Sequence, residues 1–326
     1  MGTGRSVRVV KVRGMGAAMA LTLTLVMGLT GAASSDGPGG AVPEIGPEIG
    51  PEIETVAGPV TETLTGPVDA AVRPGRVVSI NLCTDQLAMM LAAPGQLLSV
   101  SHLAADPQSS AMADRAAGYQ LNRGRAEEVW LMQPDLVLAD AFTDPATVAL
   151  LRRLGLNVAV TAPAYGMADI PARLREVGVA LGRAEAADRA VAAFQTRLAA
   201  LREEVAHHPR AALYYANGYT SGDSSLAGEI IATAGFANIA GEAGVPAGGH
   251  LPLEVLALAA PELVISGRPY PGGSRSEEVL HHPVLTALQR RTAGAVHTSA
   301  DWVCATPHVL EAIEEMRETR RRMERR

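Results

Sequence analysis

Two segments of this 326-residue chain match each other position for position. Residues 127–138 and 254–265 each contain a glutamate, six mostly apolar residues, a proline, an acidic residue and a short apolar run. Each glutamate falls in the first turn of a predicted helix, where a negative charge complements the helix dipole, and each proline ends that helix before a buried strand. Because the copies lie about half the folded length apart, the repeat predicts two similar lobes.

Strand-length apolar runs alternate with helical patterns along the rest of the folded part. This alternation predicts an α/β fold with mostly parallel sheets. The predicted strands are 77–80, 97–100, 136–139, 158–160, 211–215, 263–265 and 296–298, and helices between them include 85–91, 126–132 and 146–154.

A helix is predicted over residues 184–205, which are rich in Ala, Leu, Arg and Glu and contain neither Gly nor Pro. A helix of that length spans about 33 Å at 1.5 Å per residue. We expect it to bridge the two lobes as a stiff strut, with a ligand cleft between the lobes and little hinge motion.

The amino-terminus has the three parts of a secretory signal peptide: four basic residues, an apolar run over 15–29, and small residues before Ser34. The alternative is a transmembrane anchor, which needs about 20 unbroken apolar residues. This run is shorter and contains two glycines, and no cysteine follows it to carry a lipid. The sequence therefore predicts export with cleavage, and a mature protein that works outside the cytoplasm.

These features divide the chain into five parts. The region after the signal is rich in Gly and Pro, repeats PEIG, and is predicted to be a disordered leader because it buries too little apolar surface. The predicted parts are the signal peptide (1–33), the leader (34–75), the N-terminal lobe (76–166), a linking helical segment (167–209) and the C-terminal lobe (210–326).

Charge excludes several classes of function. Removing the signal takes away four positive charges and no negative ones, so the formal net charge of −6 becomes about −10, which makes nucleic acid a poor partner. Lys11 is the single lysine, so the mature chain has none for a Schiff base or a phosphate-binding loop. The arginine-rich tail, residues 317–326, is either a solvated helix end or a membrane or partner contact.

Four stretches together resemble periplasmic substrate-binding proteins for ferric siderophores and cobalamin: 76–101, 127–139, 217–240 and 282–302. The resemblance extends over residues 76–316. It implies two α/β lobes joined by one long helix, and capture of a small-molecule ligand without catalysis or a cofactor. That ligand is a ferric siderophore, haem or a corrinoid, which a monomeric binding protein delivers to an inner-membrane ABC permease.

The resemblance also assigns Glu127 and Glu254 to permease docking, because a glutamate at a helix start in each lobe of such proteins pairs with permease arginines. The alternative for both is a helix-start acid without a partner.

Ligands of parallel sheets bind beyond the carboxyl ends of the strands, and aromatic residues are scarce here (3%), so aromatic residues after strands are the first candidates. The candidate ligand-binding residues are Asn81, Arg123, Phe142, Tyr215, Asn217, Tyr219, His250 and Trp302.

Tryptophan placement bears on the choice of ligand. Cobalamin binders of the family flank the corrin ring with several tryptophans, whereas Trp130 falls in a core helix pattern and leaves Trp302 alone. A cobalamin-specific binder is therefore an alternative, and a ferric siderophore or haem is favoured.

Cys83 and Cys304 are the two cysteines, and three states are open for them. They form a disulfide, as export permits, or remain two separate buried thiols, or contact a metal or ligand. A disulfide requires Cα atoms within about 7 Å.

Three other classes are considered. A direct zinc or manganese binder is disfavoured, because the histidine pairs 207–208 and 281–282 precede prolines at helix or loop ends rather than strand ends. No metal site is therefore predicted. An enzyme is disfavoured because no nucleophile elbow, zincin helix or phosphate loop occurs. A sensor or partner protein on the same fold remains open.

Overall fold

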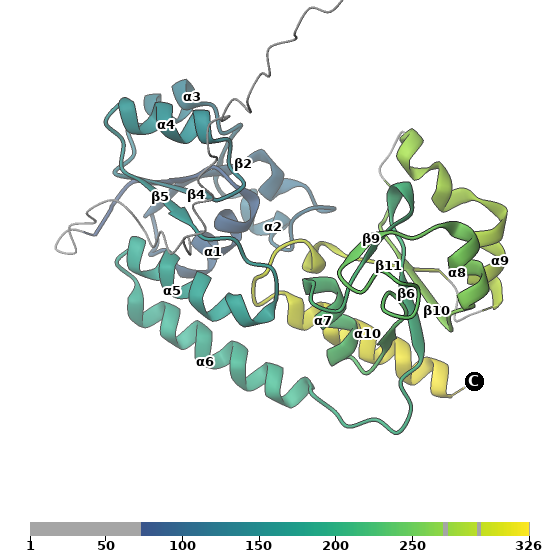
Figure 1. The fold of residues 1–326 in the computed structure, drawn as a ribbon. Coiled ribbons are helices and arrows are strands. Elements are labelled where there is room, and N and C mark those ends of the chain that lie inside the picture. The colour runs from purple at the N-terminus through teal and green to yellow at the C-terminus, as the bar shows by residue number, and fades with distance from the viewer. Residues whose placement is uncertain (1–72, 270–272, 292–294, 326) are drawn as a thin grey trace, which may run out of the picture. The chain divides into compact units, whose positions relative to one another are not determined.

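The first half of the folded chain forms a parallel sheet, of which β2, β4 and β5 are labelled in Figure 1. Its strand order is β3-β2-β1-β4-β5 within the described residues. The computed structural model describes residues 73–269, 273–291 and 295–325. The predicted signal peptide and nearly all of the predicted leader lie outside them. The strands are β1 (Val77–Ser79), β2 (Leu97–Ser101), β3 (Gln120–Asn122), β4 (Leu136–Asp140) and β5 (Val158–Thr161).

Helices cover both faces of this sheet, which is why its central strands are apolar on both sides. Leu136 faces a cluster formed with α1 and α5, whereas its neighbour Val137 faces a cluster formed with α3 and α4. The helical elements are α1 (Leu82–Leu91), η1 (His102–Ala105), α2 (Ala113–Ala116), α3 (Ala126–Leu131), α4 (Pro145–Arg153), η2 (Met167–Asp169) and α5 (Ile170–Ala180).

The second half repeats this plan. Its described strands form a parallel sheet of order β11-β10-β6-β8, and β7 and β9 form a separate antiparallel pair. The strands are β6 (Arg210–Leu213), β7 (Tyr219–Ser221), β8 (Ala237–Asn238), β9 (Gly248–His250), β10 (Leu263–Ser266) and β11 (Ala295–His297). The helical elements are η3 (Ala216–Gly218), α7 (Leu226–Thr233), α8 (Leu253–Ala259), η4 (Arg275–His281), α9 (Pro283–Arg291), η5 (Ala300–Trp302) and α10 (Val309–Glu324).

One long helix, α6 (Ala184–Leu201), runs between the two sheets in the chain. It packs closely on α5: a Cβ added to Gly178 would lie 2.4 Å from the Cβ of Ala187. The helix is 18 residues long, or about 27 Å, and ends four residues before the predicted end at 205. Arg202 after it is already extended.

The arginine-rich tail continues α10 and contacts the chain beyond α6. Glu203 accepts hydrogen bonds from Arg317 at 2.9 Å, Arg320 at 3.0 Å and Arg321 at 3.3 Å. Arg320 is buried and also donates to the carbonyl oxygen of Ala234 at 3.0 Å. Part of the tail is therefore packed against the fold rather than solvated.

The predicted fold class is confirmed: two similar sets of parallel strands with covering helices and one long helix between them. All predicted strands and named helices occur, within a few residues of their expected ends. The sequence did not predict β3, β7, β8 or β9.

In the described residues no helix has the length and apolar character needed to cross a membrane. The described residues all belong to one compact unit of the chain, Val60–Arg326.

Candidate ligand-binding cavity and docking surfaces

A cavity of about 510 Å³ is lined by residues that follow strands of both sheets. Asp140 ends β4, Thr161 ends β5, and Thr298 follows β11. The carboxyl ends of parallel strands are where ligands bind in open α/β sheets. Its other lining residues are Cys83, Thr84, Leu87, Phe142, Ala162, Pro163, Ala164, Tyr165, Arg173, Tyr215, Ser221, Ser225, Leu226, Ala227, Trp302, Val303 and Ala305.

Aromatic side chains stand on both sides of this cavity. Phe142 and Tyr165 lie in the loops after β4 and β5 and are 69% and 65% exposed, so their rings are free to contact a ligand. Tyr215 and Trp302 come from the second half and are more buried. Tyr165 was missed at the sequence level, although it lies four residues after β5 and strand ends were the guide.

The position of Phe142 is set by a tight turn after β4. The carboxylate of Asp140 accepts the backbone N–H of Phe142 at 2.9 Å and the hydroxyl of Thr143 at 3.2 Å. This is the side-chain turn that aspartate favours. It holds the exposed ring of Phe142 at the cavity.

Tyr215 and Trp302 supply polar groups as well as ring faces. Burial raises the pKa of the Tyr215 phenol above its ordinary value, against the opposing effect of a Ser221 hydrogen bond. The phenol is therefore protonated at neutral pH and can donate a hydrogen bond. The indole Nε1 of Trp302 has no hydrogen-bond partner within the described residues. A buried indole N–H ordinarily has one.

Arg173 on α5 brings a cation to the same cavity. Its guanidinium pairs with Glu176 at 2.9 Å and donates to the carbonyl oxygen of Pro163 at 3.4 Å. Burial raises the pKa of Glu176, and the charge of Arg173 opposes this. The pair leaves the Nε of Arg173 without a partner among the described residues.

Cys83 and Cys304 are joined in a disulfide, with Cα atoms 5.4 Å apart. Of the three states that the sequence left open, the structure has this one. The bond links the start of α1 to the segment after η5, 221 positions along the chain. Close by, the hydroxyl of Thr306 donates to the Gln86 side chain at 3.2 Å, so α1 is attached to this segment twice.

A buried carboxyl group, Asp85, lies on α1 one residue after the cavity residue Thr84. Burial raises its pKa to about 6. The backbone N–H and hydroxyl of Ser101 donate to it at 3.0 and 2.5 Å, which lowers the pKa in part, and Asp140 raises it slightly.

Three other predicted ligand residues gather on the antiparallel β7–β9 pair, outside the cavity lining. Tyr219 and His250 are opposite each other in the register, and both are exposed. Asn217, in the turn before β7, has a φ of 56°, a left-handed conformation that asparagine tolerates better than most residues. The sequence placed these residues after a strand and in a glycine-rich loop, but not as neighbours.

Neither Asn81 nor Arg123 lines the cavity or belongs to the β7–β9 pair. The side-chain oxygen of Asn81 accepts the backbone N–H of Cys83 at 2.8 Å and caps α1, so it is engaged in the fold. Arg123 is exposed, and its backbone N–H donates to Glu128 at 2.8 Å.

The prediction for Trp130 was wrong. It was assigned to a core helix pattern, yet it is 48% exposed on α3. This short helix buries only Ala126 and Val129, so one narrow face satisfies the sheet and the next positions point to solvent. Trp302 is still the sole tryptophan among the described cavity residues, because Trp130 lies on the surface of α3 outside the cavity rather than in the core.

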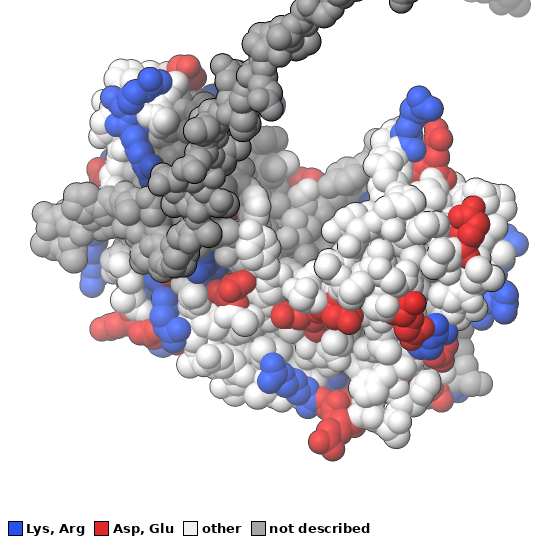
Figure 2. All heavy atoms as spheres, in the orientation of Figure 1, with Lys and Arg blue, Asp and Glu red and all other residues white. Residues whose placement is uncertain are grey.

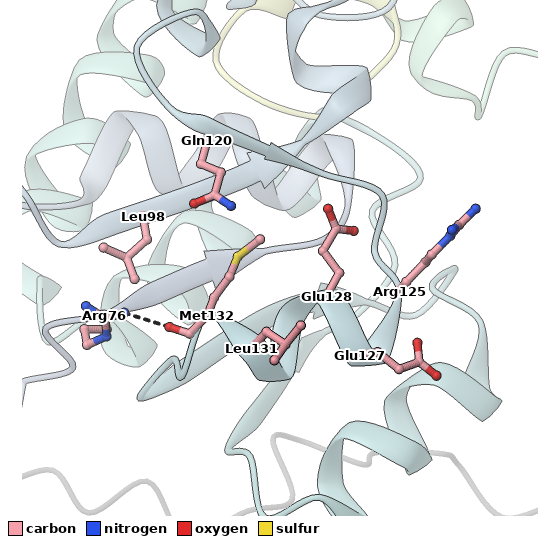
Figure 3. Close-up of a pocket in the computed structure, with 8 residues that line it drawn as sticks. All are labelled: Arg76, Leu98, Gln120, Arg125, Glu127, Glu128, Leu131 and Met132. Carbon is pink, nitrogen blue, oxygen red and sulfur yellow. Dashed lines mark hydrogen bonds between the residues drawn. The ribbon is translucent and has the colours of Figure 1, made fainter.

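Glu127 and Glu254 occupy equivalent places, each in the first turn of a short helix, α3 and α8, and each exposed. Beside Glu127 is a surface hollow of about 700 Å³ (Figure 3). Figure 3 shows Glu127 and Glu128 pointing in different directions from the helix start. The hollow is lined by Arg76, Leu98, Gln120, Arg125, Glu127, Glu128, Leu131 and Met132.

Charged side chains of both signs are interspersed over the described part of the face drawn in Figure 2. Many form ion pairs, such as Arg210 with Glu242 and Arg197 with Glu311. In the part of the chain that the structure describes, no group of three or more His, Cys, Asp or Glu side chains is placed to hold a metal ion.

Two parallel sheets joined by one long helix, with a cavity at their strand ends, define the class of two-lobed solute-binding proteins. Residues 77–244 match the family model described as periplasmic binding protein, so the chain belongs to the periplasmic binding protein family. The family resemblance inferred from the sequence is thereby confirmed.

Among curated proteins, the chain is similar to the cobalamin-binding proteins of two Halobacterium salinarum strains, with 27% identity over 199 residues, 60% of this chain. The chain spans about half (54%) of the length of these relatives.

Solved structures share the fold. The periplasmic heme-binding protein RhuT of Roseiflexus sp. RS-1 has a TM-score of 0.61 at 22% identity, covering 75% of this chain and 98% of its own. The periplasmic vitamin B12 binding protein BtuF of Vibrio cholerae has a TM-score of 0.58 at 19% identity, covering 78% and 99%.

Proposed function

We propose that this protein is the solute-binding component of an ABC importer and captures a metal chelate, either haem, a ferric siderophore or a corrinoid. The observation that carries the proposal is the cavity at the strand ends, with aromatic side chains from both halves of the chain. Its volume lies within the range of small-molecule sites, about 300–1,000 Å³.

The lining favours a flat ligand with acidic or carbonyl groups. Ring faces of Phe142 and Tyr165 suit a macrocycle or an aromatic chelate. The protonated phenol of Tyr215 and the guanidinium of Arg173 are donors that suit carboxylate or carbonyl oxygens. The exposed Tyr219 and His250 pair is a second contact region in this proposal.

A cobalamin-specific binder is the second candidate, and two observations favour it. The curated relatives are named for cobalamin binding. The shortage of tryptophan is also less of an objection than the sequence implied, because Phe142, Tyr165 and Tyr215 add three aromatic rings to Trp302 in the cavity.

Ligand binding is tested by absorbance titration of the purified mature protein with haemin, cyanocobalamin and a ferric catecholate siderophore. We expect saturable binding of one ligand class at one site per chain. In Phe142→Ala and Tyr215→Ala the affinity for that ligand should fall about tenfold each, as for loss of an aromatic contact. Trp130→Ala removes an exposed aromatic side chain outside the cavity and serves as the matched control. Failure of all three ligand classes to bind would refute the proposal.

Delivery to an inner-membrane permease follows from the same proposal. Glu127 and Glu254 dock on permease arginines, and the protein acts as a periplasmic monomer without enzymatic activity, exported by its signal peptide. Reversing both charges, in Glu127→Arg with Glu254→Arg, should abolish uptake and leave ligand affinity intact. Unchanged uptake would exclude docking through these carboxylates, and a deletion strain with normal uptake would instead favour a sensor role.

A further inference from the structure

Each of the two matched helices exposes a leucine four residues after its glutamate. Leu131 on α3 is 73% exposed and Leu258 on α8 is 87% exposed. These are the two most exposed large apolar side chains in the described residues. Single exposed leucines are common on protein surfaces, but these two occupy the same position of a repeated segment.

Helix geometry places each leucine beside its glutamate, because residues four apart lie on one face of a helix. Glu127 and Leu131 form one such pair, and Glu254 and Leu258 form the other. Within the described residues, neither glutamate makes a hydrogen bond or an ion pair. Each half of the protein thus offers an unpaired carboxylate and an uncovered apolar side chain together.

The hollow beside Glu127 and Leu131 indicates which kind of side chain from a partner could bind there (Figure 3). Leu98, Leu131 and Met132 give it apolar walls, and Glu127 and Glu128 add carboxylates. A long cationic side chain fits this combination, because its methylene stem packs on apolar surface while its charged end meets a carboxylate.

One of the two arginines that line the same hollow, Arg76, is already engaged with the backbone. Its guanidinium donates to the backbone carbonyl oxygens of Met132 at 2.7 Å and Gln133 at 3.1 Å. The other arginine of the hollow, Arg125, points away from Glu127 in Figure 3 and forms no ion pair with it within the described residues, so Glu127 is available to a cation from another molecule.

We propose that Leu131 and Leu258 are the apolar anchors of the two docking surfaces, each working with the glutamate one turn before it. The occupant is the permease of the proposed function, on which this inference rests. Because the pair is repeated, the permease must present two equivalent sites, each with an arginine beside an apolar side chain. Two like subunits would provide them.

The test measures docking of the purified protein to a permease complex of the source organism in nanodiscs, by biolayer interferometry. The variants are Leu131→Ser, Leu258→Ser and the double variant. Val179→Ser is the matched control, since Val179 is 54% exposed on α5, away from both pairs. Circular dichroism and titration with haemin and cyanocobalamin check that folding and ligand binding are unchanged.

We expect the dissociation constant to rise about tenfold for each single leucine variant and about a hundredfold for the double variant, as for buried anchors of an interface. The control should dock as the wild type does. If the leucine variants dock like the control while Glu127→Arg with Glu254→Arg loses docking, this inference is wrong and the proposed function stands. If the wild-type protein itself does not dock, the proposed delivery to a permease fails, and this inference fails with it.

Discussion

The disulfide between Cys83 and Cys304 should make an unusually large contribution to stability, because it joins residues 221 positions apart. Closing a loop of that length in the unfolded chain removes an entropy worth about 5 kcal/mol at 25 °C in the chain-entropy description. The perturbation is the double variant Cys83→Ser with Cys304→Ser.

The expected effect on the melting temperature follows from the size of the folded part. At roughly 2.1 cal/mol/K per residue, about 250 residues unfold with an entropy near 0.5 kcal/mol/K, so a loss of about 5 kcal/mol lowers Tm by about 10 °C. The assay is thermal unfolding of the mature protein by circular dichroism, with and without a phosphine reductant.

The wild type in reductant should unfold like the double variant, and reductant should not change the variant. A Tm difference below about 2 °C between wild type and variant would refute the reasoning. It would mean that the unfolded chain is not constrained by this bond, or that the bond strains the fold by as much as it stabilises it.

Three further predictions concern stability. Asp85→Asn should remove a pH dependence of the free energy of unfolding. Because the pKa of Asp85 is raised to about 6 in the folded state, the wild type loses stability as the pH rises from about 4 to about 6, and the loss is complete above that range. The variant should therefore gain about 3 kcal/mol on the wild type between pH 4 and pH 7, measured by urea unfolding. Gly178→Ala should cost about 1–3 kcal/mol in the same assay, because the new methyl group collides with Ala187 and separates α5 from α6. Arg320→Ala should cost about 2 kcal/mol, because the carbonyl oxygen of Ala234 loses a buried hydrogen bond and the arginine stem leaves a void.

Each of these predictions has a control and a contradicting result. Equal pH profiles for wild type and the Asp85 variant would rule out a titrating buried carboxyl group. Gly118→Ala, where the nearest atom is at ordinary contact distance, should be nearly neutral, and a similar loss at both glycines would contradict the packing argument. Arg322→Ala on the exposed side of α10 should change little, so equal losses at both arginines would point to overall charge rather than burial.

The sequence predicted those parts of the fold that depend on local patterning. Strands such as β4 and β10 are continuous apolar runs, and α6 is a long stretch without helix breakers, so neighbours along the chain determine both. The repeat of the glutamate and proline positions also reported a real repetition of structure.

Other parts depend on contacts that no local pattern encodes. The strands β7 and β9 lie in glycine-rich segments and pair across a gap of more than twenty residues, so the neighbours Tyr219 and His250 could not be matched in advance. Trp130 shows the limit of helical patterning, since the pattern places a residue on a helix face but does not show whether another element covers that face.

The candidate ligand residues remain a prediction, but some of those chosen because they follow strands line one cavity. Phe142, Tyr215 and Trp302 are the three, whereas Arg173 lines the same cavity from a helix and had no sequence signal of this kind. The pairing of the cysteines required three-dimensional proximity, which the sequence left open.

The double attachment of α1 to the segment after η5 has a mechanical consequence. Cys83 forms a disulfide with Cys304, and Gln86 accepts a hydrogen bond from Thr306. The walls of the cavity therefore cannot move apart at this point. If a permease opens the cavity to release the ligand, the opening must be a rotation about this pivot, with the largest displacement at the walls farthest from it. The ligand would then leave by the side of the cavity opposite the disulfide. The distance of a wall residue from the disulfide, rather than the strength of any single contact, would determine how far that side opens.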